Sequence, residues 1–261
     1  MYSALCLCYE INNRLFIEGV SVMNEELEIV KLDLNNIEQV KNVKSNPAIK
    51  ATILSVLKTV PIIGELADST IDIFLTNFQA KKRKELLEII LSDINITSEM
   101  VNDVEFIMNF AKTLEAVNRL ATSDKVKYFA NLLKNSYFGS DKIDNNEFEE
   151  FFDAINNLSY RQIQVLTILY SIENNPEPYI DKAISEKEYL PSRYWSAFKK
   201  ELEYKLHINQ DDVYSIMKSI EKTGLFTLYN GFSFGSIEEG TLTPYFKKFA
   251  NRILEISSGS K

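Results

Sequence analysis

The fold is decided by residues 211–234, which read DDVYSIMKSIEKTGLFTLYNGFSF. An acidic start, followed by apolar residues at steps of three and four, predicts a helix over the first half of this stretch. Gly224 is placed to end that helix, with Leu225 covering its last turn. Two short apolar runs then surround Asn230-Gly231, the strongest local signal for a β-hairpin in the chain. The stretch therefore predicts a helix followed by a hairpin.

A second helix is predicted upstream, where a capping box marks its first turn. The Ser159 side chain can accept from the amide of Gln162 while the Gln162 side chain reaches back, and Leu158 and Ile163 form the hydrophobic staple around them. An apolar helix follows. Helix, helix and hairpin, in this order along the chain, are typical of a winged helix.

The first half of the chain is predicted to be helical from about residue 47 to residue 137. Apolar residues recur at helical spacing from Ile49 to Phe78, interrupted at Pro61 and Gly64, and the pattern continues past Lys81-Lys82-Arg83-Lys84. This predicts a helical hairpin or a sharply kinked pair. Thr97-Ser98 is the predicted N-cap of the next helix.

These segments define the fold class and the domains. The sequence predicts a mainly α protein: an N-terminal helical bundle, followed by a C-terminal winged-helix-like domain with a small β-hairpin. Residues 23–137 are the helical domain with its hydrophobic hairpin, and residues 147–256 are the winged-helix-like domain. The boundary is placed in the polar stretch from Gly139 to Asn146. Residues 1–22 are interpreted as a non-native or disordered extension, with Met23 as the expected native start.

The charge distribution argues against nucleic acid as a partner. The net charge is −8, and counting by segment gives −1 for residues 1–22, −2 for residues 23–137 and −5 for residues 138–261. The predicted helix from Asp211 to Thr223 has three acidic and two basic residues, whereas duplex DNA is bound by clustered Lys and Arg. This helix is therefore interpreted as a protein-contact or packing module.

The sequence shows no arrangement typical of a catalytic or metal site. Cys6 and Cys8 have no nearby His or second Cys pair, and His207, the only histidine, is interpreted as a partly exposed structural residue. We therefore predict no catalytic residue, no metal and no cofactor. No signal peptide and no bilayer-spanning apolar run is present, so the cytoplasm is the expected compartment.

The hydrophobic hairpin and the basic run after it are the candidate contact region. One interpretation is a core hairpin with a solvated basic edge, and the other is a segment that meets a membrane or a partner upon activation. The expected partners are another protein, a second copy of the chain or a membrane surface. The residues assigned to this contact are Ile53, Leu57, Ile71, Phe74, Lys81, Lys82, Arg83 and Lys84.

A set of short motifs resembles a known family. These motifs are Pro61-Ile-Ile-Gly64, the basic run, Lys127-Tyr-Phe-Ala-Asn-Leu-Leu133, Leu158-Ser159 and the predicted wing with its closing helix. Their succession, over roughly residues 55–255, resembles the abortive-infection alpha (Abi-alpha) family of bacterial phage-resistance proteins. Phe246 departs from the pattern, which usually has Gly there. The resemblance implies a non-enzymatic protein of antiviral defence. The alternative is a winged-helix transcription regulator with a helical sensing or dimerisation domain.

Overall fold

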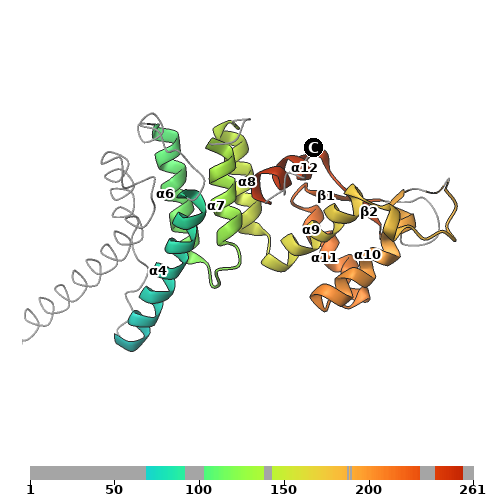
Figure 1. Cartoon of the computed structure of the whole chain (residues 1–261), viewed down its shortest axis with the longest axis horizontal. Helices are drawn as coiled ribbons and strands as arrows, with labels where there is room; N and C mark the ends of the chain where they lie inside the picture. The colour runs from blue at the N-terminus through green and yellow to red at the C-terminus, as the bar shows by residue number, and fades with distance from the viewer. Residues whose placement is uncertain are drawn as a thin grey trace, which may run out of the picture. The chain divides into compact units, whose positions relative to one another are not determined.

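The structure is a computed structural model, and it describes residues 69–91, 103–137, 143–186, 188, 190–229 and 239–254. The chain divides into two compact units, Met1–Ser140 and Asp141–Lys261, and each is described by itself (Figure 1). Residues 1–22 are outside the described residues, so the predicted extension and the start at Met23 stay predictions.

Unit 1 contains three described helices that pack against one another: α4 (Ser69–Leu91), α6 (Val104–Arg119) and α7 (Val126–Tyr137). Helix α4 is continuous through the basic run, as the sequence predicted. Helix α7 is buried on most of its circumference.

The start of α6 differs from the prediction. Asp103 is its N-cap: it has an extended backbone, and its side chain accepts from the amides of Glu105 and Phe106 at 3.0 and 3.4 Å. One unbroken helix from Ser98 through Val104 would need a helical Asp103, so the prediction of a single helix here is wrong. Thr97-Ser98 themselves are outside the described residues, and their role as a cap stays a prediction. The aspartate carboxylate also favours a helix N-terminus electrostatically, which Thr and Ser do not.

Unit 2 contains five helices among its described residues: α8 (Asn145–Asn157), α9 (Tyr160–Asn174), α10 (Leu190–Leu206), α11 (Val213–Glu221) and α12 (Pro244–Ile253). Short 3₁₀ turns, η1 (Glu177–Tyr179) and η2 (Gln210–Asp212), precede α10 and α11. The predicted capping box of α9 is confirmed: Gln162 N donates to Ser159 Oγ at 3.1 Å, and Ser159 N donates to Gln162 Oε1 at 2.8 Å. Leu158 and Ile163 are buried beside it.

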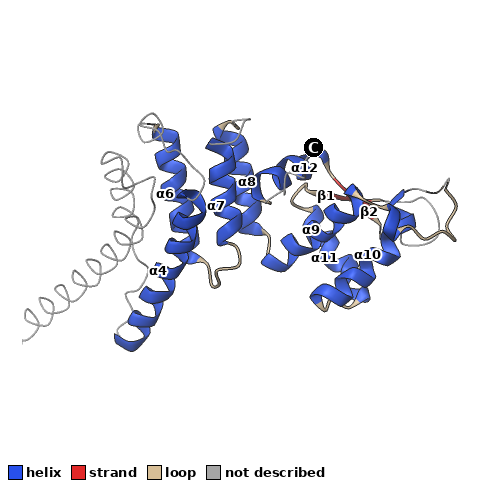
Figure 2. Ribbon diagram, in the orientation of Figure 1, coloured by secondary structure: helices blue, strands red, loops and turns tan. Residues whose placement is uncertain are grey.

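The hairpin of unit 2 is formed by β1 (Phe226–Leu228) and β2 (Gly240–Leu242), which pair antiparallel with Phe226 opposite Leu242 (Figure 2). The predicted tight turn at Asn230-Gly231 is wrong, because Tyr229 N donates to Glu239 O at 2.8 Å. The connection therefore includes residues 230–238, which are outside the described residues. Burial sets this register, since Phe226 and Leu242 both face the core.

Helix α10 was missed by the sequence analysis. Its buried residues Tyr194, Trp195, Phe198 and Leu202 recur at steps of three and four, and Pro191 stands near its start. Together the elements of both units confirm a mainly α fold with one small hairpin among the described residues. No helix in these described ranges is long and apolar enough to cross a membrane.

Candidate functional site

The predicted contact region divides between the surface and the interior of unit 1. Lys81 and Lys84 are exposed, whereas Lys82 and Arg83 are each only 1% exposed. Ile53 and Leu57 are outside the described residues, and Ile71 and Phe74 belong to α4, whose side chains are described from Phe78 to Ile90.

The interpretation of the whole basic run as a solvated edge is therefore wrong for Lys82 and Arg83. Contact of the run with a membrane or a partner upon activation stays a prediction. Four consecutive helical residues point in four directions, about 100° apart, so a packed helix must turn some of them inward. In α4 the inward pair is Lys82 and Arg83, and we call these two residues the buried cation pair.

The Lys82 side chain extends from α4 to the C-terminal end of α6. Its Nζ donates to the carbonyl oxygens of Asn118 and Leu120 at 2.9 and 2.6 Å, and it lies 4.7 Å from the ring centroid of Phe78. The last carbonyls of a helix have no partner within the helix and carry partial negative charge, which favours a cation there. Lys82 thus caps α6 from the neighbouring helix.

The charge of Lys82 is compensated only by neutral groups. No carboxylate in the described part of the chain forms an ion pair with it, and burial lowers its pKa from 10.5 to about 8. Arg83 points to the same end of α6, where its Nε donates to Asn118 Oδ1 at 3.0 Å. The buried cation pair therefore ties α4 to the last turn of α6.

Other polar side chains are buried around this pair, all of them in unit 1. Asn109, for example, donates from Nδ2 to Tyr137 Oη at 2.6 Å. Hydrogen-bonded polar groups inside a helical unit favour one particular arrangement of the helices over alternatives. The buried polar residues in addition to the pair are Gln79, Asn109, Thr113, Asn118, Asn131 and Ser136.

In unit 2 the candidate contact surface is the outer face of η2 and α11. Its exposed residues include Asp211, Asp212, Tyr214 and Lys222. Lys218 is exposed too, but its Nζ pairs with Glu221 Oε2 at 2.6 Å, and this bond raises the pKa of Lys218 and lowers that of Glu221. Because the charges of that pair cancel, the charges that remain on the face are those of Lys222, Asp211 and Asp212. The face therefore has no excess of positive charge.

Two carboxylates hold the edges of the hairpin beside α11. Glu173 of α9 accepts from Leu242 N at 3.0 Å and from the Thr241 hydroxyl at 2.9 Å. Glu221 of α11 accepts from Leu228 N at 3.0 Å on the other edge. Both amides point away from the partner strand, so each carboxylate satisfies an edge donor that would otherwise be available to another strand. These two residues were not singled out from the sequence.

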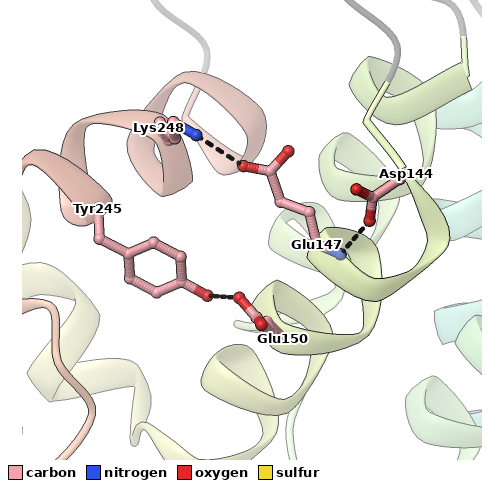
Figure 3. A network of polar contacts seen from close by, with 5 residues as sticks. All are labelled: Asp144, Glu147, Glu150, Tyr245 and Lys248. Atoms are coloured by element: carbon pink, nitrogen blue, oxygen red, sulfur yellow. Dashed lines mark hydrogen bonds and ion pairs between the residues drawn. The ribbon is translucent and has the colours of Figure 1, made fainter.

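A further polar network joins α8 and α12 (Figure 3). The Tyr245 hydroxyl donates to Glu150 Oε2 at 2.8 Å, and Lys248 Nζ lies 3.4 Å from Glu147 Oε1. Asp144 caps α8 by accepting from Glu147 N at 2.8 Å. Burial, and then the bond to Glu150, raise the pKa of Tyr245. This network fastens a basic helix to an acidic one.

His207 is an exposed residue that ends α10. Its backbone φ is +52°, the left-handed conformation of a helix stop, and Ile208 N donates back to Leu202 O at 3.3 Å. Among the described residues no group of three or more His, Cys, Asp and Glu side chains is placed to hold a metal ion. The surfaces of α4 and α11 are thus the candidate functional regions.

No protein-family model, curated protein or solved structure matches this chain. The resemblance to the abortive-infection alpha family therefore rests on the short motifs quoted above.

Proposed function

We propose that this protein is a non-enzymatic phage-defence protein of the abortive-infection type, and that unit 2 acts by contact with another protein through the outer face of η2 and α11. The proposal joins the resemblance of the sequence motifs to the surface chemistry of unit 2. A bacterial cell is its expected setting.

The observation that carries the proposal is the charge of that face. In a winged helix the helix before the hairpin is the one that enters the major groove, and neutralising phosphates requires Lys and Arg there. Here Asp211 and Asp212 precede the helix, and Lys218 is already paired with Glu221. An exposed tyrosine in the first turn of α11, Tyr214, is instead typical of protein interfaces, where Tyr is enriched.

The rival function, a winged-helix transcription regulator, is favoured by the order of elements in unit 2. A mobility-shift titration at physiological ionic strength separates the two proposals. We expect no salt-sensitive binding to duplex DNA. A shift that weakens steeply as salt rises would favour the regulator.

The direct test is expression in a host challenged with phage, with plating efficiency and survival of infected cells recorded together. We expect protection, with death or arrest of the infected cells. Tyr214→Ala should abolish protection at equal protein abundance, because it removes the aromatic contact without touching the core.

Tyr204→Ala is the matched control, since Tyr204 is 81% exposed and belongs to α10 rather than α11. It should leave protection unchanged. If both tyrosine variants protect as well as the wild type, the proposed contact face is wrong. If the wild type gives no protection against any of a broad panel of phages, the defence function itself is wrong.

A further inference from the structure

The basic run of α4 is divided by the closed arrangement of unit 1. Two of its four cations, Lys81 and Lys84, are exposed, with Lys84 Nζ 3.8 Å from Glu88 Oε1, and the buried cation pair is not exposed. Unit 1 as described therefore presents half of the positive charge that the sequence provides at this position.

The buried face of α4 combines the cation pair with aliphatic residues. Residues at positions 82, 83, 86, 87 and 90 follow the spacing of a single helical face. Leu86, Leu87 and Ile90 are each at most 2% exposed. Movement of α4 away from α6 and α7 would thus expose two cations and three large aliphatic side chains together.

The contact that keeps this face closed is imperfect. Lys82 is buried against carbonyls and a ring without a counter-ion among the described residues. At the same end of α6, Asn118 Nδ2 is buried, and the described structure offers it no hydrogen-bond partner. An unsatisfied buried donor and a desolvated charge each destabilise the packed state. The closed arrangement is consequently less stable than an apolar contact of the same size.

We propose that the contact between α4 and the C-terminal end of α6 is autoinhibitory: it withholds Lys82 and Arg83 from an anionic phospholipid surface, which α4 binds when the contact opens. This inference concerns unit 1 and goes beyond the proposed function, which rests on α11.

The composition of the buried face selects phospholipid over nucleic acid. Cations alone would suit either ligand, since both present phosphates. Leu86, Leu87 and Ile90, however, find no apolar environment on a DNA or RNA backbone, whereas the headgroup boundary of a bilayer takes apolar side chains and pairs with lysines and arginines at the same depth. A ligand that binds only the open form shifts the population toward it.

The experiment uses two substitutions of one residue in the full-length protein. Asn118→Leu removes both the unsatisfied Nδ2 and the Oδ1 that accepts from Arg83 Nε. It should favour opening, because a lost bond to a buried charge costs more than an unsatisfied neutral donor. Asn118→Asp places a carboxylate where the amide is, beside Arg83 Nε and close to Lys82, and should favour closure. The two substituted side chains have similar size and the same branching. They should change the contact in opposite directions, because one is apolar and the other is negatively charged.

Co-sedimentation with vesicles of phosphatidylserine and phosphatidylcholine is the readout. We expect Asn118→Leu to bind about thirtyfold more tightly than Asn118→Asp, with wild type between, because two further cations reach the surface and each contributes about 1 kcal/mol there. Vesicles of phosphatidylcholine alone should bind none of them. Equal binding of the two variants would overturn the proposal, as would tighter binding of Asn118→Leu to duplex DNA than to the anionic vesicles.

Hydrogen exchange of the α4 amides keeps the proposal testable if Asn118→Leu does not fold. Asn118→Asp should then show slower exchange in α4 than the wild type, since the added carboxylate stabilises the closed contact. Exchange that is equal or faster would contradict the autoinhibitory role. Neither readout depends on phage protection, so failure here and failure of the proposed function can be told apart.

Discussion

The two units have interiors of different chemistry. All of the buried polar and charged residues among the described ones belong to unit 1, and the described interior of unit 2 is aliphatic and aromatic. Unit 2 uses its polar groups at the periphery, where Glu173 and Glu221 hold the hairpin and Ser159 caps α9. Burial of apolar side chains stabilises a fold. Burial of polar and charged groups is less favourable, but it allows only those helix arrangements in which these groups find partners.

Two helix ends show the same contrast on a smaller scale. The last carbonyls of α6 accept from buried Lys82, and the last carbonyls of α10 accept from Arg161 Nη2, at 3.3 Å for Leu206 O and 3.2 Å for His207 O. Both cations interact favourably with the negative end of a helix. Only Lys82 loses its hydration to do so, and its pKa falls accordingly. The difference predicts that unit 1 is the unit that can be opened.

The largest effect is expected from Phe198→Ala in unit 2. Phe198 is fully buried, with its ring centroid 4.9 Å from that of Trp195. Removing a buried aromatic ring typically destabilises by about 3–5 kcal/mol. Trp195 is the only tryptophan, so its fluorescence during denaturant unfolding reports unit 2 specifically. A loss below about 1 kcal/mol would mean that this interior is not the tightly packed one described.

Gly240→Ala should destabilise the hairpin by about 1–3 kcal/mol, the usual range for overpacking. A Cβ at this position would lie 2.2 Å from Phe226 Cζ and 2.3 Å from the carbonyl oxygen of Thr227. The backbone oxygen cannot move without breaking the pairing of the two strands. Trp195 stacks near Phe226, with ring centroids 6.2 Å apart, so the same fluorescence measurement detects the change. Thr227→Ala, at an exposed position of the partner strand, is a control that adds no atom.

Lys82→Met tests the interior of unit 1 and should behave oppositely to Phe198→Ala. Replacing Lys82 by an apolar residue of similar length removes the cost of desolvating the charge, and this gain offsets the loss of its bonds to the two carbonyls. We expect the variant to be at least as stable as the wild type at pH 7. Amide exchange in α4 and α6 is the measurement, because Trp195 does not report unit 1.

The free energy of unfolding of the wild type should depend on pH differently from that of Lys82→Met, and the sign follows from the pKa of Lys82. The folded pKa of Lys82, about 8, is below its ordinary value of 10.5, so between these pH values the unfolded chain binds more protons than the folded one. The free energy of unfolding of the wild type therefore rises with pH in this window, relative to Lys82→Met. Below pH 8 Lys82 is charged in both the folded and the unfolded chain, so the full cost of burying the charge is present. The difference in the free energy of unfolding between wild type and Lys82→Met should then be constant. A difference that does not change from pH 7 to pH 10 would contradict the buried charge.

The features that the sequence predicted correctly depend on neighbours along the chain. Ser159 and Gln162 satisfy each other three residues apart. Gly224 has the predicted left-handed conformation, with φ of +73°, although it closes the turn after α11 and the helix itself ends at Glu221. The predicted pairing across Asn230-Gly231 failed because Phe226 is buried opposite Leu242 of a later strand, and this burial overrode the local signal. The start of α6 at Asp103 could have been read from the same local rules that identified Ser159.

The buried cation pair could not be predicted in this way. A basic run on a helix is ordinarily solvated, and nothing near Lys82 in the sequence indicates burial. Its partners are carbonyls at the end of α6, at Asn118 and Leu120, which the sequence does not mark as unusual. Only the packing of α4 against α6 reveals them. The periodicity of α10, by contrast, was present in Tyr194 and Phe198 and was overlooked.

The smallest expected effect is a gain, from His207→Gly at the exposed end of α10. A side chain in the left-handed conformation costs about 1 kcal/mol, since its Cβ approaches the following carbonyl, and glycine avoids this contact. Glycine also costs more entropy in the unfolded chain, which offsets part of the gain. We therefore expect stabilisation of at most about 1 kcal/mol, measured by Trp195 fluorescence in denaturant.

His207→Ala is the matched control: it removes the imidazole but keeps the Cβ, and should leave stability unchanged. If His207→Ala stabilises as much as His207→Gly, the imidazole rather than the backbone is responsible.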